Sequence, residues 1–72
     1  MKTVLVFKTS VTGRSEVNTL KPQLNQLINE NGRWNFDLED CDNILRVETF
    51  STQARAIKDT LQQQGFLCEE LI

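Results

Sequence analysis

Histidine is absent from the 72 residues of this chain, and cysteine occurs only at Cys41 and Cys68. The absence of histidine excludes zinc sites built from cysteine and histidine, and catalytic pairs in which histidine activates a nucleophile. The two cysteines are far apart in the sequence, so they fit neither a disulfide framework nor a zinc-binding pair. No activated nucleophile or buried carboxylate pair can be named, so we expect a protein that is not an enzyme and holds no cofactor.

A long apolar run is also missing, because no stretch of about 18 consecutive apolar residues occurs. The sequence therefore predicts no transmembrane helix and no membrane partner. The apolar run near the N-terminus is too short for a signal peptide, and no small-residue cleavage site follows it. We interpret this run as a strand and expect a cytoplasmic protein.

Excess positive charge is missing as well, since 10 acidic residues outnumber 8 basic ones and give a net charge of −2. Proteins that bind nucleic acids are basic overall or carry a basic stripe, so we expect no nucleic-acid partner. A chain of 72 residues is long enough for one domain, residues 1–72, with a small core.

Residues 2–9 alternate in a way that predicts a strand. One face carries Leu5, Phe7 and Thr9, with Val11 beyond them, and the other face carries Val4 and Val6. Because both faces are apolar and rich in β-branched and aromatic residues, we expect this strand at the centre of its sheet.

A helix is expected after a loop at residues 11–15. Ser15 is the predicted N-cap, and Glu16 then lies in the first turn, where the helix dipole favours a carboxylate. Helical spacing gives one apolar stripe, formed by Val17, Leu20, Leu24, Leu27 and Ile28.

Pro22 leaves two alternatives for where this helix begins. A helix that starts at Ser15 contains Pro22 in its interior and should be kinked there, whereas a helix that starts near Thr19 has Pro22 in its first turn. We favour the first alternative because Val17 fits the apolar stripe. Asn31 and Gly32 are expected to end the helix in a left-handed conformation.

The second half predicts a hairpin, a helix and a last strand. Residues 33–39 and 44–49 form the hairpin around a polar turn at residues 40–43, with Trp34, Phe36, Leu38, Leu45 and Val47 facing inward. Ser51 or Thr52 caps a helix with the apolar stripe Ala54, Ile57 and Leu61, and Gly65 follows its end. Residues 66–71 form the last strand, with Phe66 and Cys68 on one face.

This βαββαβ order predicts an α+β fold of the ferredoxin-like type. Right-handed crossovers give a two-layer sandwich, with a four-stranded antiparallel sheet of strand order 4-1-3-2 and two helices on one face.

The same elements resemble the heavy-metal-associated domain, the soft-metal-binding module of copper chaperones and metal-pumping ATPases. In that family the first strand runs into Met-x-Cys-x-x-Cys, and a helix of pattern Val-x-x-Val/Leu-x-x-x-Leu follows. The corresponding frame here is Val11-Thr12-Gly13-Arg14-Ser15-Glu16, followed by Val17, Leu20 and Leu24. The segments Trp34-Asn35-Phe36-Asp37-Leu38, Asn43–Val47 and Gly65-Phe66 match the second strand, the third strand and the end of the second helix.

The metal-binding residues of that family are not present in this frame. Val11 stands in the methionine position, Gly13 in the position of the first cysteine and Glu16 in that of the second. Two thiolates on one loop capture Cu(I), whereas glycine offers no ligand and glutamate offers a hard oxygen. The metal transfer that the resemblance implies is therefore not expected here, and neither is a bound metal ion.

Two alternatives concern metal ions. Cys41, together with Glu16 or across a dimer, is the weak candidate for residual metal binding. Cys41 and Cys68 are expected at opposite edges of the sheet, about 14 Å apart, which is too far for a disulfide or a shared metal. The acidic cluster of Asp37, Glu39, Asp40 and Asp42 suggests a hard-cation site such as one for Ca²⁺, but the ligand spacing and glycine of such a loop are missing.

Another alternative is an anion site at residues 12–15, where Arg14 lies beside a predicted helix N-terminus. Acylphosphatases use the same fold with an arginine in the corresponding loop. Their loop pattern is missing here, and the carboxylate of Glu16 would repel phosphate.

The preferred hypothesis is a non-enzymatic interaction or regulatory module. Its binding surface would be the rim around the first loop or the sheet face away from the helices. The candidate residues on that face are Val4, Val6, Ile44 and Arg46, with Lys8 and Glu48 beside them. The expected partner is an unidentified protein or a second copy of the chain.

Overall fold

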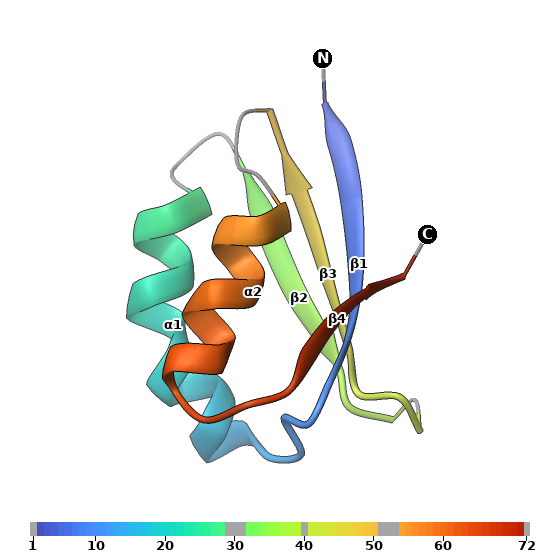
Figure 1. Ribbon diagram of the computed structural model, residues 1–72, viewed down its shortest axis with the longest axis vertical. Helices are drawn as coiled ribbons and strands as arrows, with labels where there is room; N and C mark the ends of the chain where they lie inside the picture. The colour runs from blue at the N-terminus through green and yellow to red at the C-terminus, as the bar shows by residue number, and fades with distance from the viewer. Residues whose placement is uncertain (1, 29–31, 40, 51–53, 72) are drawn as a thin grey trace.

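The computed structural model describes residues 2–28, 32–39, 41–50 and 54–71. Its strands are β1 (Thr3–Thr9), β2 (Arg33–Asp37), β3 (Ile44–Thr49) and β4 (Cys68–Leu71), and its helices are α1 (Arg14–Ile28) and α2 (Ala54–Gln63). The strands form one antiparallel sheet in the order β2-β3-β1-β4, and both helices lie on one face of it (Figure 1). The predicted ferredoxin-like two-layer sandwich, with strand order 4-1-3-2, is therefore confirmed.

Strand β1 lies between β3 and β4, at the central position that its two apolar faces predict. Phe7 and Thr9 are buried on the helix side, whereas Val4 on the other side is 52% exposed. The Thr9 hydroxyl donates to the carbonyl oxygen of Asn43 at 2.6 Å, which satisfies a buried polar group and ties β1 to the turn before β3.

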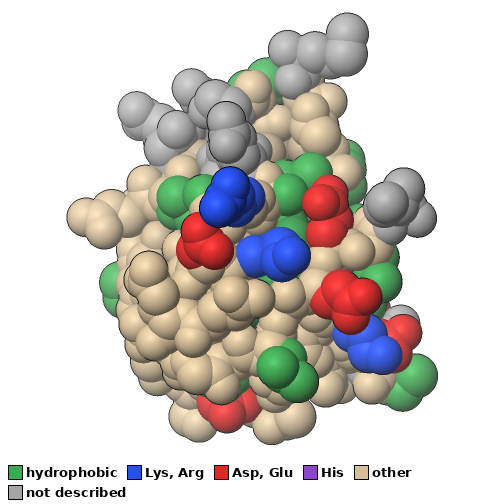
Figure 2. Space-filling model, viewed as in Figure 1, with side chains coloured by type: hydrophobic (Ala, Val, Ile, Leu, Met, Phe, Trp, Pro, Cys, Tyr) green, Lys and Arg blue, Asp and Glu red, His purple; other side chains and the backbone are tan. Residues whose placement is uncertain are grey.

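On the side of the molecule seen in Figure 2, basic and acidic side chains are interspersed.

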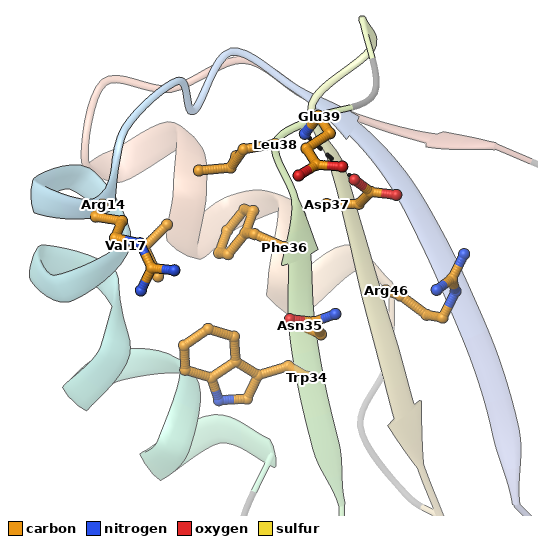
Figure 3. A pocket seen from close by; sticks show the side chains of 9 residues that line it. All are labelled: Arg14, Val17, Trp34, Asn35, Phe36, Asp37, Leu38, Glu39 and Arg46. Atoms are coloured by element: carbon orange, nitrogen blue, oxygen red, sulfur yellow. Dashed lines mark hydrogen bonds between the residues drawn. The ribbon is translucent and has the colours of Figure 1, made fainter.

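Strand β2 forms one edge of the sheet, next to β3. Its side chains alternate as predicted: Trp34 and Phe36 are half-buried, whereas Arg33, Asn35 and Asp37 are exposed. Figure 3 shows the two aromatic rings on the α1 side of the strand. The rings contact each other edge to face, with centroids 5.9 Å apart and an interplanar angle of 78°.

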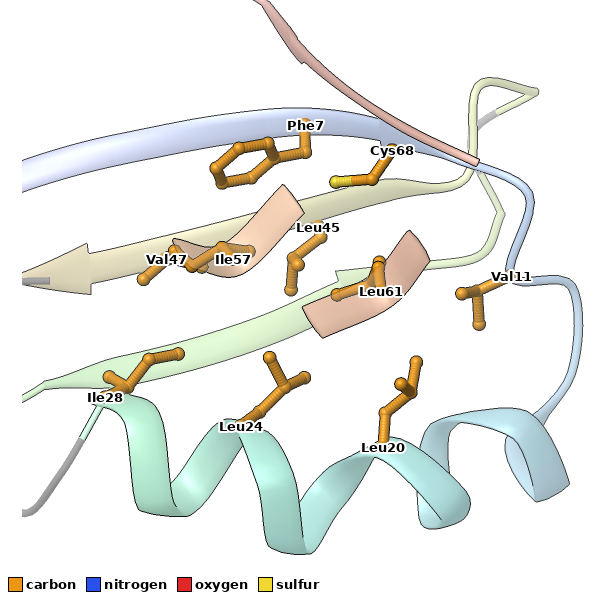
Figure 4. Packing of buried hydrophobic residues seen from close by; sticks show 10 residues of the cluster. All are labelled: Phe7, Val11, Leu20, Leu24, Ile28, Leu45, Val47, Ile57, Leu61 and Cys68. Atoms are coloured by element: carbon orange, nitrogen blue, oxygen red, sulfur yellow. The ribbon is translucent and has the colours of Figure 1, made fainter. Parts of the chain in front are cut away.

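The hydrophobic core fills the space between the sheet and the two helices (Figure 4). Its buried members are Phe7, Val11, Leu20, Leu24, Ile28, Leu45, Val47, Ile57, Leu61 and Cys68. Val17, Leu27, Leu38, Ala54 and Phe66 pack against this cluster from its margins. The predicted apolar stripes of both helices and the predicted inward faces of the strands are thus confirmed.

The N-terminus of α1 differs from the prediction. The first intrahelical bond joins the Val17 N–H to the Gly13 carbonyl oxygen at 3.1 Å, so Gly13 is the N-cap. The prediction that Ser15 caps the helix is wrong, because Ser15 already lies inside the first turn. Pro22 lies inside one helix that runs from Arg14 to Ile28, which excludes the alternative start near Thr19.

The C-terminus of α2 ends as the sequence predicts. Gly65 has a φ of 89°, a left-handed conformation that glycine adopts without steric cost. Its N–H donates to the Gln62 carbonyl oxygen at 3.0 Å, and the Phe66 N–H donates to that of Leu61 at 3.0 Å. These two bonds form a Schellman motif, which satisfies carbonyl groups that the helix end would leave unpaired.

Two strands are shorter than predicted. Strand β2 ends at Asp37, whose Oδ1 accepts a hydrogen bond from the Glu39 N–H at 3.2 Å. Strand β4 begins at Cys68, because Leu67 before it exchanges hydrogen bonds with Ser10. The predicted helix stop at Asn31, the turn residue Asp40 and the caps Ser51 and Thr52 lie outside the described residues.

Candidate functional site

The first loop is the segment in which the sequence resembles the metal-site frame of the heavy-metal-associated domain, and its first residue belongs to the core. Val11 is fully buried, and its N–H donates to the Thr9 hydroxyl at 3.2 Å. Figure 4 shows the side chain directed toward Leu61 and Leu20. Val11 is thus a packing residue that closes one end of the core.

Glu16 holds the loop together through its carboxylate. Its Oε1 accepts hydrogen bonds from the Thr12 N–H at 2.8 Å and from the Thr12 hydroxyl at 3.1 Å. The hydrogen bond from the Thr12 backbone is the main reason that the pKa of Glu16 lies below its ordinary value. The Glu16 carboxylate therefore acts as a capping group for the loop and α1.

Arg14 and Glu16 leave little room for an anion site at this helix N-terminus. The Glu16 carboxylate already accepts a hydrogen bond from the loop backbone, so an incoming phosphate would meet a negative charge there. The Arg14 side chain lies beside Val17, on the side of α1 that faces β2 (Figure 3). The geometry gives no support to an anion site formed by residues 12–15.

The two cysteines are free thiols in different environments. Cys41 is exposed in the turn between β2 and β3, and Cys68 is buried on β4 at the opposite edge of the sheet. Burial raises the pKa of the Cys68 thiol from 9.0 to about 11, so this sulfur is protonated at neutral pH and is a poor soft-metal ligand. Within the described residues, no group of three or more His, Cys, Asp and Glu residues could hold a metal ion.

The acidic residues of the predicted cation site make separate interactions with other groups. Asp37 bonds to the backbone of Glu39, and Asp42 lies 3.6 Å from the Lys8 ammonium. Asp40 lies outside the described residues. The Thr9 N–H also donates to the carbonyl oxygen of Asp42 at 3.2 Å, so the hairpin turn lies beside the end of β1.

The sheet face away from the helices carries a small apolar centre. Val4 is 52% exposed and Leu71 is 39% exposed, while Val6 is partly buried between Leu71 of β4 and Arg46 of β3. We call Val4, Val6 and Leu71 the open-face patch. Ile44 does not belong to it, because it stands between Lys8 and Asp37 in the sheet and is only 8% exposed.

Charged residues surround the open-face patch. Lys8 lies opposite Glu69, and the Lys2 ammonium lies 2.7 Å from the Glu48 carboxylate. Lys2 is the principal reason that the pKa of Glu48 is lowered. The sequence predicted Val4, Val6 and Arg46 on this face but missed Leu71, although the same alternation that places Cys68 inward places Leu71 outward.

A pocket of about 560 Å³ lies along β2 and was not predicted from the sequence. Val17 of α1 lines it together with Trp34, Phe36 and Leu38, and Arg46 of β3 lies on the other side of the strand (Figure 3). The indole N–H of Trp34 donates to Asn25 Oδ1 at 2.8 Å, which fixes the ring against α1. The pocket therefore follows the outer edge of the sheet and has rigid aromatic walls.

Comparisons of the chain with protein-family models, curated proteins and solved structures found no match. Among the described residues, no helix combines the length and the apolar character needed to cross a membrane.

Proposed function

We propose that this protein is a non-enzymatic domain of the heavy-metal-associated type whose soft-metal loop has been lost, and that it serves as a protein-interaction or regulatory module. The observation that carries the proposal is the loop itself. Its three metal-site positions hold a buried packing residue, Val11, an N-cap, Gly13, and a capping carboxylate, Glu16. The loop is built for stability and has no ligand set for a soft ion.

The open-face patch is the surface that we propose for the partner. Val4 and Leu71 expose apolar area on a rigid sheet, and charged residues of both signs border it. An apolar centre with a polar rim is the composition of protein–protein interfaces. The partner that fits this surface is a protein with an apolar patch and charges of both signs around it.

Residual metal binding through Cys41 and Glu16 has less support. The Glu16 carboxylate is engaged by Thr12, and the described residues contain no third ligand of the metal-binding types for such a site. A single thiol with one hard oxygen does not match the preference of Cu(I) for paired soft ligands.

The test compares proteins captured from a cell extract by the parent chain and by two variants of equal charge. Val4→Lys changes the open-face patch, whereas Gln62→Lys changes an exposed position on α2. We expect that a partner captured by the parent is lost with Val4→Lys and kept with Gln62→Lys. Capture that is the same with all three proteins, or no capture by the parent, would contradict the proposed surface. Circular dichroism of each variant checks that the fold is intact.

A further inference from the structure

Strand β2 is an edge strand, with β3 on one side and no strand of the described chain on the other. An edge presents a row of backbone donors and acceptors that can pair with another strand. The pocket of about 560 Å³ along β2 has Val17 on one side of the strand and Arg46 on the other. The outer side of the strand is therefore accessible to a second strand.

The five residues of β2 complement their own sequence when the direction is reversed. Arg33 and Asp37 at the two ends carry opposite charges, Trp34 and Phe36 are both aromatic, and Asn35 lies at the centre. In an antiparallel pair centred on Asn35, Arg33 of each copy lies opposite Asp37 of the other, and each Trp34 lies opposite a Phe36. The pair is symmetric, so each favourable contact occurs twice.

We propose that β2 pairs with β2 of a second copy of this chain, antiparallel and centred on Asn35, to form a dimer with one continuous sheet. The partner is thus identified by the strand's own charge and aromatic pattern. In this arrangement the helices of both copies lie on the same face of the joined sheet.

The positions of the side chains fit this pairing. Arg33, Asn35 and Asp37 are exposed on the open face, and Trp34 and Phe36 are half-buried on the helix side. Residues directly opposite each other on paired strands share a face, with Cβ atoms about 5 Å apart. Charged residues would therefore meet charged residues, and aromatic rings would meet aromatic rings.

Two contacts within the monomer prepare the surface for pairing. The hydrogen bond from Trp34 to Asn25 holds the indole ring in place before a second copy arrives. Arg33 lies opposite Glu48 of β3, so in the dimer its guanidinium would lie between Glu48 and Asp37 of the second copy. A charge row of alternating sign then crosses the junction between the two sheets.

The other edge of the sheet lacks this self-complementarity. Strand β4 is short, and Glu69 and Glu70 occupy its middle. Antiparallel pairing of β4 with itself places these glutamates opposite or beside each other, which is unfavourable. The two edges thus differ, and a second copy is expected only at β2.

The dimer should be weak. Pairing of two five-residue strands buries less than the roughly 1,600 Å² of a typical stable interface. We expect a dissociation constant between about 10 μM and 1 mM, a range in which dilution shifts the equilibrium visibly.

The experiment is sedimentation velocity of the full chain at concentrations from about 10 μM to 1 mM, which cover the expected range of dissociation constants. Asp37→Arg and Arg33→Asp each replace two attractive pairs by two repulsive ones, so each should weaken dimerisation by about tenfold or more. The double swap Arg33→Asp/Asp37→Arg restores opposite charges between the two copies and should dimerise more strongly than either single variant, although residue 33 then carries a negative charge opposite Glu48. Asp59→Arg and Arg55→Asp, at exposed positions of α2, are the controls with the same changes in charge.

Recovery in the double swap separates an interface effect from a loss of folding, because a structural defect would not be repaired by a second reversal. A measurement without variants supports it: in a mixture of isotope-labelled and unlabelled parent chains, NMR contacts between copies should link β2 to β2. Trp34 is the single tryptophan, so its fluorescence should also change on dilution.

Several results would overturn the proposal. These are a parent that stays monomeric at the highest concentration, a dimer that Asp37→Arg leaves intact, and a double swap that does not recover. If the control variants on α2 weaken the dimer as much as Asp37→Arg and Arg33→Asp do, net charge controls the association and β2 pairing does not. The inference is independent of the proposed partner surface, because Val4→Lys should leave the dimer unchanged and Asp37→Arg should leave capture through the open-face patch unchanged.

Discussion

Gly32 is the position where the structure makes the sharpest prediction about stability. The residue lies between α1 and β2, where the chain passes close to the backbone of β3. A Cβ added at Gly32 would lie 2.8 Å from the carbonyl oxygen of Glu48 and 2.9 Å from that of Ile28, and it would also contact Ile28 Cγ2. Two of these three atoms belong to the backbone and cannot rotate away.

The size of the effect follows from two opposing contributions. Overpacking of this kind costs about 1–3 kcal/mol, and alanine returns about 0.4–1 kcal/mol by restricting the unfolded chain. We therefore expect Gly32→Ala to lower the free energy of unfolding by about 1–2 kcal/mol. In a domain of this size, that corresponds to a melting temperature lower by about 4–16 °C.

The other two glycines provide matched controls for the same substitution. A Cβ at Gly13 meets no atom within 4 Å, so Gly13→Ala should change the free energy of unfolding by less than about 0.5 kcal/mol. Gly65 also has space, but its φ is 89°, so Gly65→Ala should cost about 1 kcal/mol through backbone strain. Urea unfolding followed by circular dichroism gives all three values. A Gly32→Ala variant no less stable than Gly13→Ala would refute the close approach of the chain to β3.

Three further predictions concern single side chains. Pro22 is exposed within α1 and removes one of its backbone hydrogen bonds, so Pro22→Ala should raise the free energy of unfolding by about 1–3 kcal/mol, measured in urea. An unchanged free energy of unfolding would contradict a continuous helix. The pKa of Cys68 is raised from 9.0 to about 11, so its contribution to the free energy of unfolding is present below pH 9 and lost as the pH rises to 11. Over this pH range the parent should lose about 2–3 kcal/mol more than Cys68→Ala does in urea unfolding. The lowered pKa of Glu16 means that its contribution to the free energy of unfolding is present above the ordinary carboxyl pKa and is lost as the pH falls through the pKa of the folded state. An NMR titration should show the lowered pKa, and Thr12→Ala should bring it closer to the ordinary value by removing the hydroxyl donor. An unchanged pKa in that variant would argue against the hydroxyl hydrogen bond.

Much of the fold follows from local patterns that packing does not override. The two apolar faces of residues 2–9 identify the central strand. Phe7 on one face is buried beneath the helices, and Val6 on the other face has a neighbouring strand on each side. The φ of Gly65 follows equally directly, since a left-handed residue after the last apolar position of α2 ends the helix at low cost.

Other features depend on contacts that no local pattern contains. The start of α1 at Arg14 is coupled to a carboxylate that reaches back to Thr12, and the sequence offers Ser15 as an equally good cap. The late start of β4 depends on the bonds between Ser10 and Leu67, which are far apart along the chain. The burial of Ile44 depends on the neighbours that the register provides, Lys8 and Asp37.

The candidate site also has parts that the sequence predicts and parts that only the structure shows. That Gly13 and Glu16 stand at the cysteine positions of the proposed heavy-metal-associated frame can be read from the sequence. What Glu16 does instead becomes visible only in the structure, through its two hydrogen bonds to Thr12. The position of β2 at an edge follows from the predicted strand order, whereas the pocket along its outer side becomes visible only in the structure.

The most direct test of the central claim is a metal titration of two reduced proteins, followed by native mass spectrometry. The parent chain and the variant Gly13→Cys/Glu16→Cys are each titrated with Cu(I) and with Zn²⁺. Gly13 has space for a side chain, so the variant introduces two thiols into the first loop without a steric clash at this position. We predict no metal complex of defined stoichiometry for the parent, and a one-to-one Cu(I) complex for the variant. A parent complex tighter than about 1 μM, roughly −8 kcal/mol, would contradict the loss of the metal site. A variant that fails to bind Cu(I) would contradict the heavy-metal-associated frame.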